Sequence, residues 1–355
     1  MATDLACLRG IAALSLIAAI VIPAIAADSP AENDRVRLAV VAPVDEEHLA
    51  WAAASHLQRA ANAESLHIDV SQATIVVSEA TLPEILVMPV RSLAMQIPAF
   101  QILELPFFYD SLDVVHDRLD GVLGDLLTAE ARKHGWEVVA FWDEGMHIFS
   151  GVKSFDQASK LKGREFLMTR PDPVAEKQFW YWKADPRRID PKDRESVLSE
   201  CVIAGRALTL QETVREQLYR VHLSVSLTKH RYEGWVVVAP AERWAEITDA
   251  TKQKLRAALR ETTVWQRNDA VKREAAALAE LRRLGMRIFD VDAEEREGFR
   301  KQLPDWAGLL GDDLNEQQKR ALIDLASTGA AVVSGPGSPA TAEAGGNPAP
   351  GAEDR

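Results

Sequence analysis

The stretch over residues 136–170 constrains the fold most, because three short apolar runs follow one another there with polar breaks between them. The first run, 138–142, has the length and composition of a buried strand and ends at Asp143-Glu144-Gly145. After it we expect a second strand, a short helical turn and a third strand, over 146–149, 154–162 and 165–169. This order of buried strands and turns indicates the middle of an α/β domain.

Length and charge limit the class of protein. The chain has 355 residues, which suffices for about two domains, and 47% hydrophobic residues allow an ordinary core. A formal net charge of −12 at pH 7 argues against the basic face of a nucleic-acid-binding protein, so no nucleic-acid partner is expected. We find no Gly-rich phosphate loop and no nucleophile elbow, so neither a cofactor nor an enzyme activity is expected.

The N-terminus has the pattern of a secretory signal. Residues 11–26 form one apolar run after Arg9, and the run closes with Ala24-Ile25-Ala26, an A-x-A cleavage pattern. The run is short for a membrane span, which needs roughly 20 apolar residues. We therefore predict a signal peptide over 1–26 and a periplasmic protein, with an uncleaved anchor as the alternative. Cleavage would remove Cys7 and leave Cys201 alone, so no disulfide is expected within the chain.

The first half of the chain alternates strands and helices. Strands are expected over 35–42, 66–70, 74–77 and 85–90, and helices over 45–62 and 112–127, the second continuing through residue 131. Three histidines lie among these elements, His48, His56 and His67. They lack the spacing of a metal-ligand set, so no metal site is expected.

The second half begins with helices and ends in a low-complexity tail. Helices are expected over 172–184, 196–203, 248–284, 293–302 and 316–327, a strand over 286–289, and a polar connection over 185–194. We expect a bend in the helix over 248–284 at residues 262–264, because the run Thr-Thr-Val interrupts it. Gly, Pro, Ala and Ser dominate residues 328–355, which we expect to be a disordered tail.

Three further segments carry a family resemblance. The first, IPAFQILELPFFYDS over 97–111, suggests a strand over 101–105 that Pro106 ends, followed by three aromatic residues either beneath a cleft or in the core. The others are RLDGVLGDLL over 118–127 and YRVHLSVSLTKHRYEGWVVV over 219–238. Together with the stretch over 136–170, they resemble the DctP family, the solute-binding proteins of TRAP transporters, over about residues 35–310.

The resemblance implies an α/β fold of the two-lobe periplasmic binding protein type II kind. A cleft then lies between the lobes, and a long C-terminal helix spans both. Lobe I is expected at 35–145 plus 236–265, and lobe II at 146–235 plus 275–325. The implied function is an extracytoplasmic receptor that captures a small organic acid in the cleft and delivers it to the TRAP membrane permease.

The sequence departs from the family where ligand contacts are expected. The family has an arginine four residues after the glycine of an L-K-G tripeptide, and this chain has Leu167 there, after Leu161-Lys162-Gly163. The arginine of the family's D-x-G-f-R pattern corresponds to His147, and the asparagine of its D-G-x-E-N pattern to Leu208. Losing a buried bidentate arginine weakens the binding of a carboxylate ligand by several kcal/mol.

Four other residues are candidates for supplying ligand contacts: Arg170, Arg91, Ser92 and Arg206. Arg170 lies three residues after Leu167, which on a strand places it on the opposite side. Three functions stay open. The chain is a receptor for a small molecule, a degenerate relative without a transport ligand that acts through a protein partner, or an enzyme on the same fold. The last is not expected, because no nucleophile–base pair is recognisable.

Overall fold

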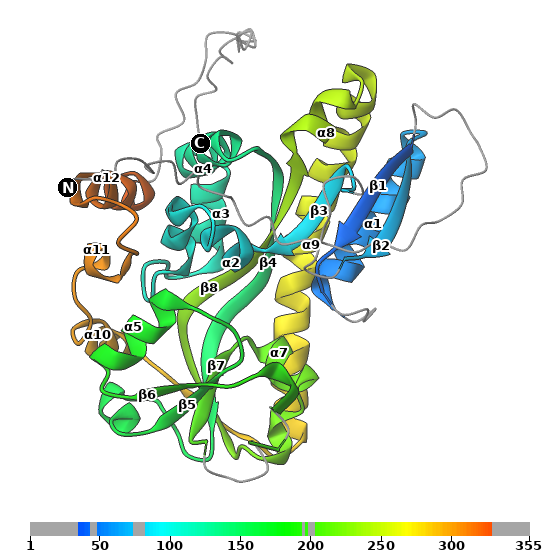
Figure 1. Cartoon of the computed structure of the whole chain (residues 1–355). Coiled ribbons are helices and arrows are strands. Elements are labelled where there is room, and N and C mark those ends of the chain that lie inside the picture. The colour runs from blue at the N-terminus through cyan, green and yellow to red at the C-terminus, as the bar shows by residue number, and fades with distance from the viewer. Residues whose placement is uncertain (1–34, 43–47, 74–81, 194–195, 198–202, 329–355) are drawn as a thin grey trace, which may run out of the picture.

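Figure 1 shows the computed structural model, which describes residues 35–42, 48–73, 82–193, 196–197 and 203–328. The expected signal peptide over 1–26, the strand over 74–77, most of the helix over 196–203 and nearly all of the tail over 328–355 lie outside the described residues. Within the described part of the chain, no helix combines the length and apolarity that crossing a membrane requires.

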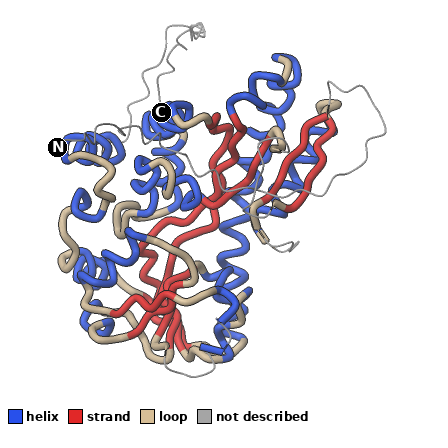
Figure 2. Tube along the Cα trace, viewed as in Figure 1, coloured by secondary structure: helices blue, strands red, loops and turns tan. Residues whose placement is uncertain are grey.

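Two long antiparallel strands, β4 (Trp136–Gly151) and β8 (Ser224–Pro240), run through the centre of the molecule (Figure 2). The predicted end of a strand at Asp143-Glu144-Gly145 is wrong, because β4 continues through it with a register shift between Asp143 and Gly145. Gly145 has a φ of 140°, which a glycine adopts without the steric cost that other residues meet. The polar break is therefore a β-bulge inside one strand.

The other strands pair on either side of this central ladder, in the order β2-β1-β3-β8-β4-β7-β5-β6, with β9 also pairing with β8. One half of the sheet carries β1 (Arg35–Val40), β2 (His67–Gln72) and β3 (Ile85–Pro89). The other half carries β5 (Glu165–Met168), β6 (Asp185–Arg188), β7 (Gly205–Leu208) and β9 (Arg287–Asp290). We call the first half lobe I and the second lobe II.

Helices cover both halves of the sheet (Figure 1). In lobe I, α1 (Leu49–Ala63) packs against α9 (Asp249–Arg283), and α9 continues unbroken through residues 262–264 to contact α7 (Leu210–Arg215) of lobe II. The remaining helices are α2 (Val90–Ala94), α3 (Leu112–Leu119), α4 (Val122–Lys133), α5 (Pro173–Tyr181), α7 (Leu210–Arg215), α8 (Ala241–Glu246), α10 (Ala293–Arg300), α11 (Trp306–Leu309) and α12 (Glu316–Ser327). The last of these, α12, packs on α4 of lobe I.

Three sequence predictions in these regions are corrected. The strand expected over 101–105 is part of a 3-10 helix, η3 (Pro98–Glu104), whose first turn contains Pro98. Every residue of η3 from Ala99 to Glu104 is buried, so its pattern has no amphipathic period to distinguish helix from strand. The single helix expected over 112–127 is two helices, because Gly121 is extended at the start of α4. The connection expected over 185–194 includes the strand β6.

The core of the molecule continues from one lobe into the other. Phe100 and Phe141 of lobe I belong to the same buried apolar cluster as Phe149 and Phe166 of lobe II. The aromatic residues after Pro106 join this core, with the Phe107 ring 5.8 Å from that of Phe299. Because the core is shared, the two lobes are packed together along the central strands.

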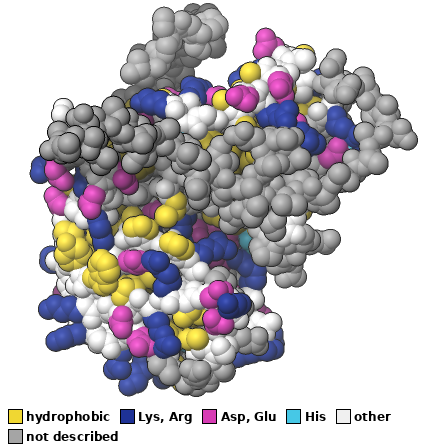
Figure 3. All heavy atoms as spheres, in the orientation of Figure 1, with side chains coloured by type: hydrophobic (Ala, Val, Ile, Leu, Met, Phe, Trp, Pro, Cys, Tyr) yellow, Lys and Arg dark blue, Asp and Glu magenta, His cyan; other side chains and the backbone are white. Residues whose placement is uncertain are grey.

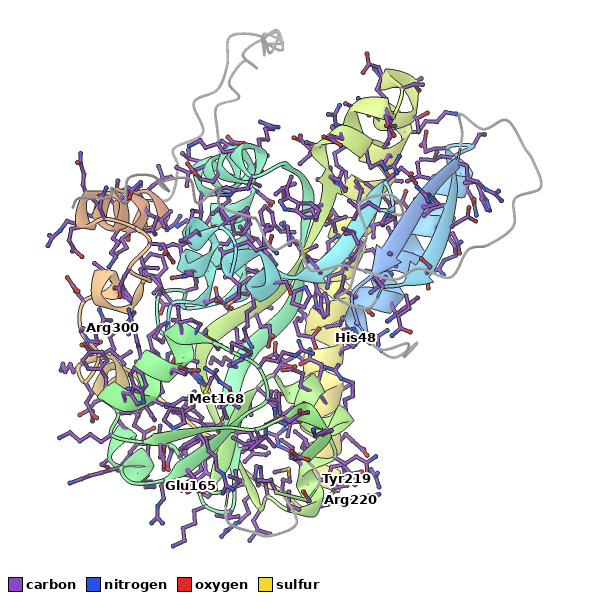
Figure 4. The ribbon with its side chains drawn as sticks, viewed as in Figure 1. His48, Glu165, Met168, Tyr219, Arg220 and Arg300 are labelled. Atoms are coloured by element: carbon purple, nitrogen blue, oxygen red, sulfur yellow. The ribbon has the colours of Figure 1, made fainter. Side chains whose placement is uncertain are left out.

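The three N-terminal histidines make separate local contacts. His48 caps α1 by accepting the Ala50 backbone N–H at 3.2 Å, and its place in lobe I is labelled in Figure 4. His56 stacks on Trp265 at 4.4 Å, and His67 lies 3.1 Å from an Asp69 carboxylate oxygen. Each histidine therefore has a packing or hydrogen-bonding role of its own.

Candidate functional site

A cavity of about 80 Å³ lies where the two lobes meet. Lobe II supplies most of its wall, from the end of β5, from α5, and from β7 and α7. Met168, labelled in Figure 4, belongs to this lobe II side. The central strands contribute His147 from β4 and Arg231 and Glu233 from β8, and α2 of lobe I contributes Arg91. Both lobes therefore place polar side chains on the same cavity.

Six of the seven residues singled out from the sequence line this cavity: Arg91, His147, Leu167, Arg170, Arg206 and Leu208. Ser92 is not among the lining residues, and its carbonyl accepts a hydrogen bond from the Gln96 side chain at 3.2 Å. The sequence therefore located the cavity, whereas the role of each of these residues in ligand binding stays a prediction.

Leu167 and Arg170 both line the cavity, although three residues separate them. The expectation that they face opposite sides assumed a strand through both positions. Strand β5 ends at Met168, so the period of two no longer applies to the following residues. Arg170 is exposed to solvent, which places it at the rim of the cavity.

Asp172 is the residue that the sequence analysis missed and that organises the site. It is 1% exposed and caps the N-terminus of α5 by accepting the Ala175 N–H at 3.0 Å. Its Oδ2 lies 2.5 Å from Arg231 Nη1 and 3.1 Å from Arg91 Nη2. Burial by itself would raise the pKa of Asp172, but Arg231 and Arg91 outweigh it and lower that pKa below the usual range.

Arg91 joins this group to two further carboxylates. Its Nε lies 3.2 Å from Glu104 Oε1, and its Nη2 lies 3.8 Å from Glu233 Oε1. Burial and the negative charge of Asp172 raise the pKa of Glu104 to about 7, although Arg91 opposes the shift. Glu104 therefore changes its charge near neutral pH, directly behind the cavity wall.

His147 is held between Glu233 and Arg231. Its Nε2–H donates to Glu233 Oε2 at 2.5 Å, and Arg231 Nη2 lies 3.4 Å from its Nδ1. Arg231 has only donors, so Nδ1 is the acceptor nitrogen and Nε2 carries the proton. Burial opposes ionisation of Glu233, but His147 and Arg91 lower the pKa of Glu233 well below its ordinary value.

The only grouping of potential metal ligands within the described residues is His147, Glu212 and Glu233, whose donor atoms lie within 4.8 Å of one another. A metal would need Nε2 of His147 without its proton, whereas the contact with Arg231 favours the tautomer that keeps the proton there. Two arginine side chains also adjoin the group, which disfavours a further cation. We therefore interpret His147 and Glu233 as a hydrogen-bonded pair, and Glu212 as part of the capping box of α7 with Thr209.

Arg206 lies at the lobe II side of the cavity and is 3% exposed. It pairs with Glu216, and its Nη2 lies 3.5 Å from Thr169 Oγ1. Its guanidinium is therefore already engaged by a carboxylate of the same lobe.

Gln178 is a second lining residue that the sequence analysis missed. It is 1% exposed on α5, and within the described part of the chain its Oε1 is buried without a hydrogen-bond partner. Leaving a buried amide oxygen unpaired is unfavourable, and because Gln178 also lines the cavity, its amide is a candidate contact for a bound molecule. The side-chain amide can both donate and accept.

The apolar part of the wall comes from Phe179 and from the ring of His230. His230 stacks on Phe149 at 4.4 Å and shares a hydrogen bond of 2.8 Å with Thr228 Oγ1. Burial lowers the pKa of His230 well below its usual value, and the positive charge of Arg231 adds to the shift. His230 is therefore a neutral ring at neutral pH.

These features define a class of protein, a two-lobe binding protein with a polar site where its lobes meet. Residues 72–307 match the family described as bacterial extracellular solute-binding protein, family 7, also called DctP. The chain belongs to this family, as its resemblance predicted, and the two-lobe α/β fold is confirmed. It is a family of solute-binding receptors and not of enzymes.

Individual relatives are distant. The C4-dicarboxylate-binding protein DctB of Bacillus subtilis is 24% identical over 213 residues, which cover 59% of this chain and 61% of that protein. The match thus spans about three fifths of that relative. A TRAP periplasmic solute-binding protein from Ochrobactrum anthropi superimposes with a TM-score of 0.74 at 18% identity, covering 82% of this chain and 94% of that one. Another from Sulfurospirillum deleyianum, with bound succinate, gives 0.68 at 19%, covering 82% and 97%.

Proposed function

We propose that this chain is an extracytoplasmic solute receptor of a TRAP-type transporter. The observation behind the proposal is the cavity between the lobes, which is lined by Gln178 of lobe II and by Arg91 of lobe I. A small polar solute would complete these contacts. Family membership makes an organic acid the first class to test, because a relative of known structure holds succinate.

Capture would work by closure of the two lobes around the solute. Strands β4 and β8 connect the lobes, and their register shifts between Asp143 and Gly145, close to the point where the lobes meet. Bulges bend a strand locally, so this pair of strands suits a hinge. A solute that contacts Arg91 and Gln178 together would bind the closed arrangement more tightly than an open one and would shift the population toward it.

The partner that receives the solute would be the membrane permease of the transporter, and the receptor would work in the periplasm. Both proposals rest on family membership and on the signal-like pattern over 1–26. Release of the protein by osmotic shock of intact cells checks the location. Retention with the cytoplasmic fraction would contradict it.

Thermal denaturation of the purified chain in the presence of candidate solutes tests the receptor role. The panel should contain organic acids, amino acids, and neutral amides and polyols. A solute at a hundredfold excess over its dissociation constant stabilises the native state by about 2.7 kcal/mol, which raises the unfolding midpoint clearly. Native mass spectrometry of the same protein detects any solute that co-purifies. A flat panel together with an empty mass spectrum would contradict the receptor proposal.

A further inference from the structure

We infer that the cleft takes an uncharged polar solute in preference to an acid, because the carboxylate of Asp172 occupies the position between Arg91 and Arg231 that an acid would use. This inference rests on the proposed receptor function and names the chemical class of its solute.

The contacts of Asp172 are those that bind a foreign carboxylate in other proteins. Arginines hold carboxylates through short charge-assisted hydrogen bonds. Here one carboxylate oxygen receives Arg231 Nη1 at 2.5 Å and faces Arg91 Nη2 at 3.1 Å. Arg91 belongs to lobe I and Asp172 to lobe II, so the chain's own carboxylate connects the two lobes as a bound acid would.

An entering acid would not easily displace Asp172. The same side chain caps α5 through the Ala175 N–H, and a helix loses stability when such a cap is removed. Displacement would also leave a carboxylate that is 1% exposed without its cationic partners, which is strongly unfavourable. Asp172 is therefore a fixed part of the wall.

The remaining charges of the wall are balanced as well. Four arginines and four carboxylates line the cavity: Arg91, Arg170, Arg206 and Arg231, with Asp172, Glu212, Glu216 and Glu233. Arg206 is engaged by Glu216, and Arg170 is exposed at the rim, where water screens its charge. Figure 3 shows acidic and basic side chains interspersed over the described part of the visible face. Among the wall arginines of the described residues, only Arg170 lacks a carboxylate contact, so an entering carboxylate would meet only its screened charge.

A neutral solute finds suitable contacts at the same place. Gln178 lines the cavity, and its side-chain amide can both donate to and accept from a neutral polar group. Phe179 offers apolar contact beside it on the same helix. The cavity therefore offers both a polar amide and an apolar surface to a neutral solute.

Matched pairs of probes test the preference on the unaltered chain. Calorimetric titration compares succinate with succinamide, lactate with lactamide, and glucuronate with glucose. We expect the neutral member of any pair that binds to bind on the order of tenfold more tightly than the acid. An acid that binds as tightly as its neutral partner, or more tightly, would overturn the inference.

The variant Asp172→Ser tests the mechanism. Serine keeps the N-cap of α5 but removes the carboxylate and leaves room beside the two arginines. We expect acetate to raise the thermal midpoint of Asp172→Ser and to leave that of the unaltered chain unchanged, with chloride at equal ionic strength as the reference. Succinate should also bind the variant on the order of tenfold more tightly than it binds the unaltered chain.

The control variant is Asp156→Ser, which removes another lobe II carboxylate, one that pairs with Lys160 at 2.6 Å away from the cavity. It should gain no acetate response. A folded Asp172→Ser protein without an acetate response would overturn the inference, and if this variant fails to fold, the probe pairs on the unaltered chain decide. Failure of the receptor proposal can be distinguished from failure of this inference. If the chain is not a receptor, no solute of any class stabilises the unaltered chain.

Discussion

Two buried aspartates show how the same charge serves different ends in this molecule. Asp143 and Asp172 are each 1% exposed, and each accepts hydrogen bonds from distant parts of the chain. Asp143 accepts from the Tyr232 hydroxyl at 3.2 Å and lies 2.7 Å from His116 Nε2. The Gln266 amide also bonds its backbone on both sides, at 2.9 and 2.7 Å.

The partners of Asp172 are two arginines, and they lie at a cavity wall. Asp143 lies outside the residues that line this cavity and ties α3 and α9 to the central strands at the bulge. Burial and hydrogen bonding are common to both aspartates, so these two properties alone do not identify a binding site. A pair of permanent cations facing a cavity, with an unpartnered amide beside them, is what distinguishes the second aspartate.

The largest effect should follow from Arg231→Ala. This change removes the closest partner of Asp172 and leaves a buried carboxylate with Arg91 alone, so unfolding in urea should show a loss of about 3–5 kcal/mol. The control Arg132→Ala breaks the exposed pair with Glu137 and should cost less than about 1 kcal/mol. Equal losses in the two variants would contradict a special role for the Asp172 group.

Asp143→Ala should come next, with a loss of about 2–3 kcal/mol, because it removes the contact to His116 and leaves the buried Tyr232 hydroxyl with only the Trp142 carbonyl as acceptor. Asp143 belongs to the framework of the fold and does not line the cavity. Solute affinity, measured at a temperature where the variant is fully folded, should therefore stay within about twofold of the unaltered chain. A large loss of affinity without a loss of stability would reverse the distinction between the two aspartates.

The secondary structure was predictable from the sequence where it depends on residues that are close together in the chain. The apolar strands and the long helix follow their periodicity, and the ends of β3 and α9 lie within one or two residues of expectation. The cavity was located through motif spacing, which placed His147, Leu167 and Leu208 on its wall. The bulge at Gly145 was not predicted, because a polar break within a strand and the end of a strand have the same composition.

The contacts of Asp172 with the two arginines were not predicted, for a different reason. An aspartate before a proline at a helix start has a sufficient local explanation as an N-cap, and the structure confirms that cap. Nothing local indicates that its second oxygen meets Arg91, 81 positions earlier in the numbering, and Arg231, 59 positions later. Pairings between distant segments depend on the tertiary fold, so residue spacing could not supply them.

A smaller effect concerns pH. The pKa of Glu104 rises from an ordinary 4.5 to about 7, so its stabilising contribution is complete below pH 4.5 and is lost as pH rises through 7. Glu104→Gln should therefore gain stability relative to the unaltered chain between pH 5 and pH 8, by about 2 kcal/mol. The comparison uses differences between the two proteins at each pH, which cancels the effect of Glu144, whose pKa also rises to about 7. A difference that does not change with pH would contradict this assignment.

The smallest effect should come from Gln178→Leu. Its Oε1 has no partner within the described chain, so an apolar replacement of similar size should change stability by less than about 1 kcal/mol. Affinity for a neutral solute should fall about tenfold, which corresponds to about 1.4 kcal/mol. The exposed Gln253→Leu on α9 is the matched control and should leave affinity unchanged.

The most direct test of the central claim is the distance between the lobes. Spin labels at Ala129→Cys on α4 and Ser159→Cys on η4 (Ala158–Leu161), with Cys7 and Cys201 replaced by alanine, report it by pulsed electron resonance. Without any solute, we predict a short label-to-label distance with a narrow distribution in the chain that keeps Asp172. In Asp172→Ser the distance should be longer and its distribution broader, and acetate should restore the short distance. The same distribution in both proteins, unchanged by acetate, would contradict the claim that the Asp172 carboxylate holds the lobes together.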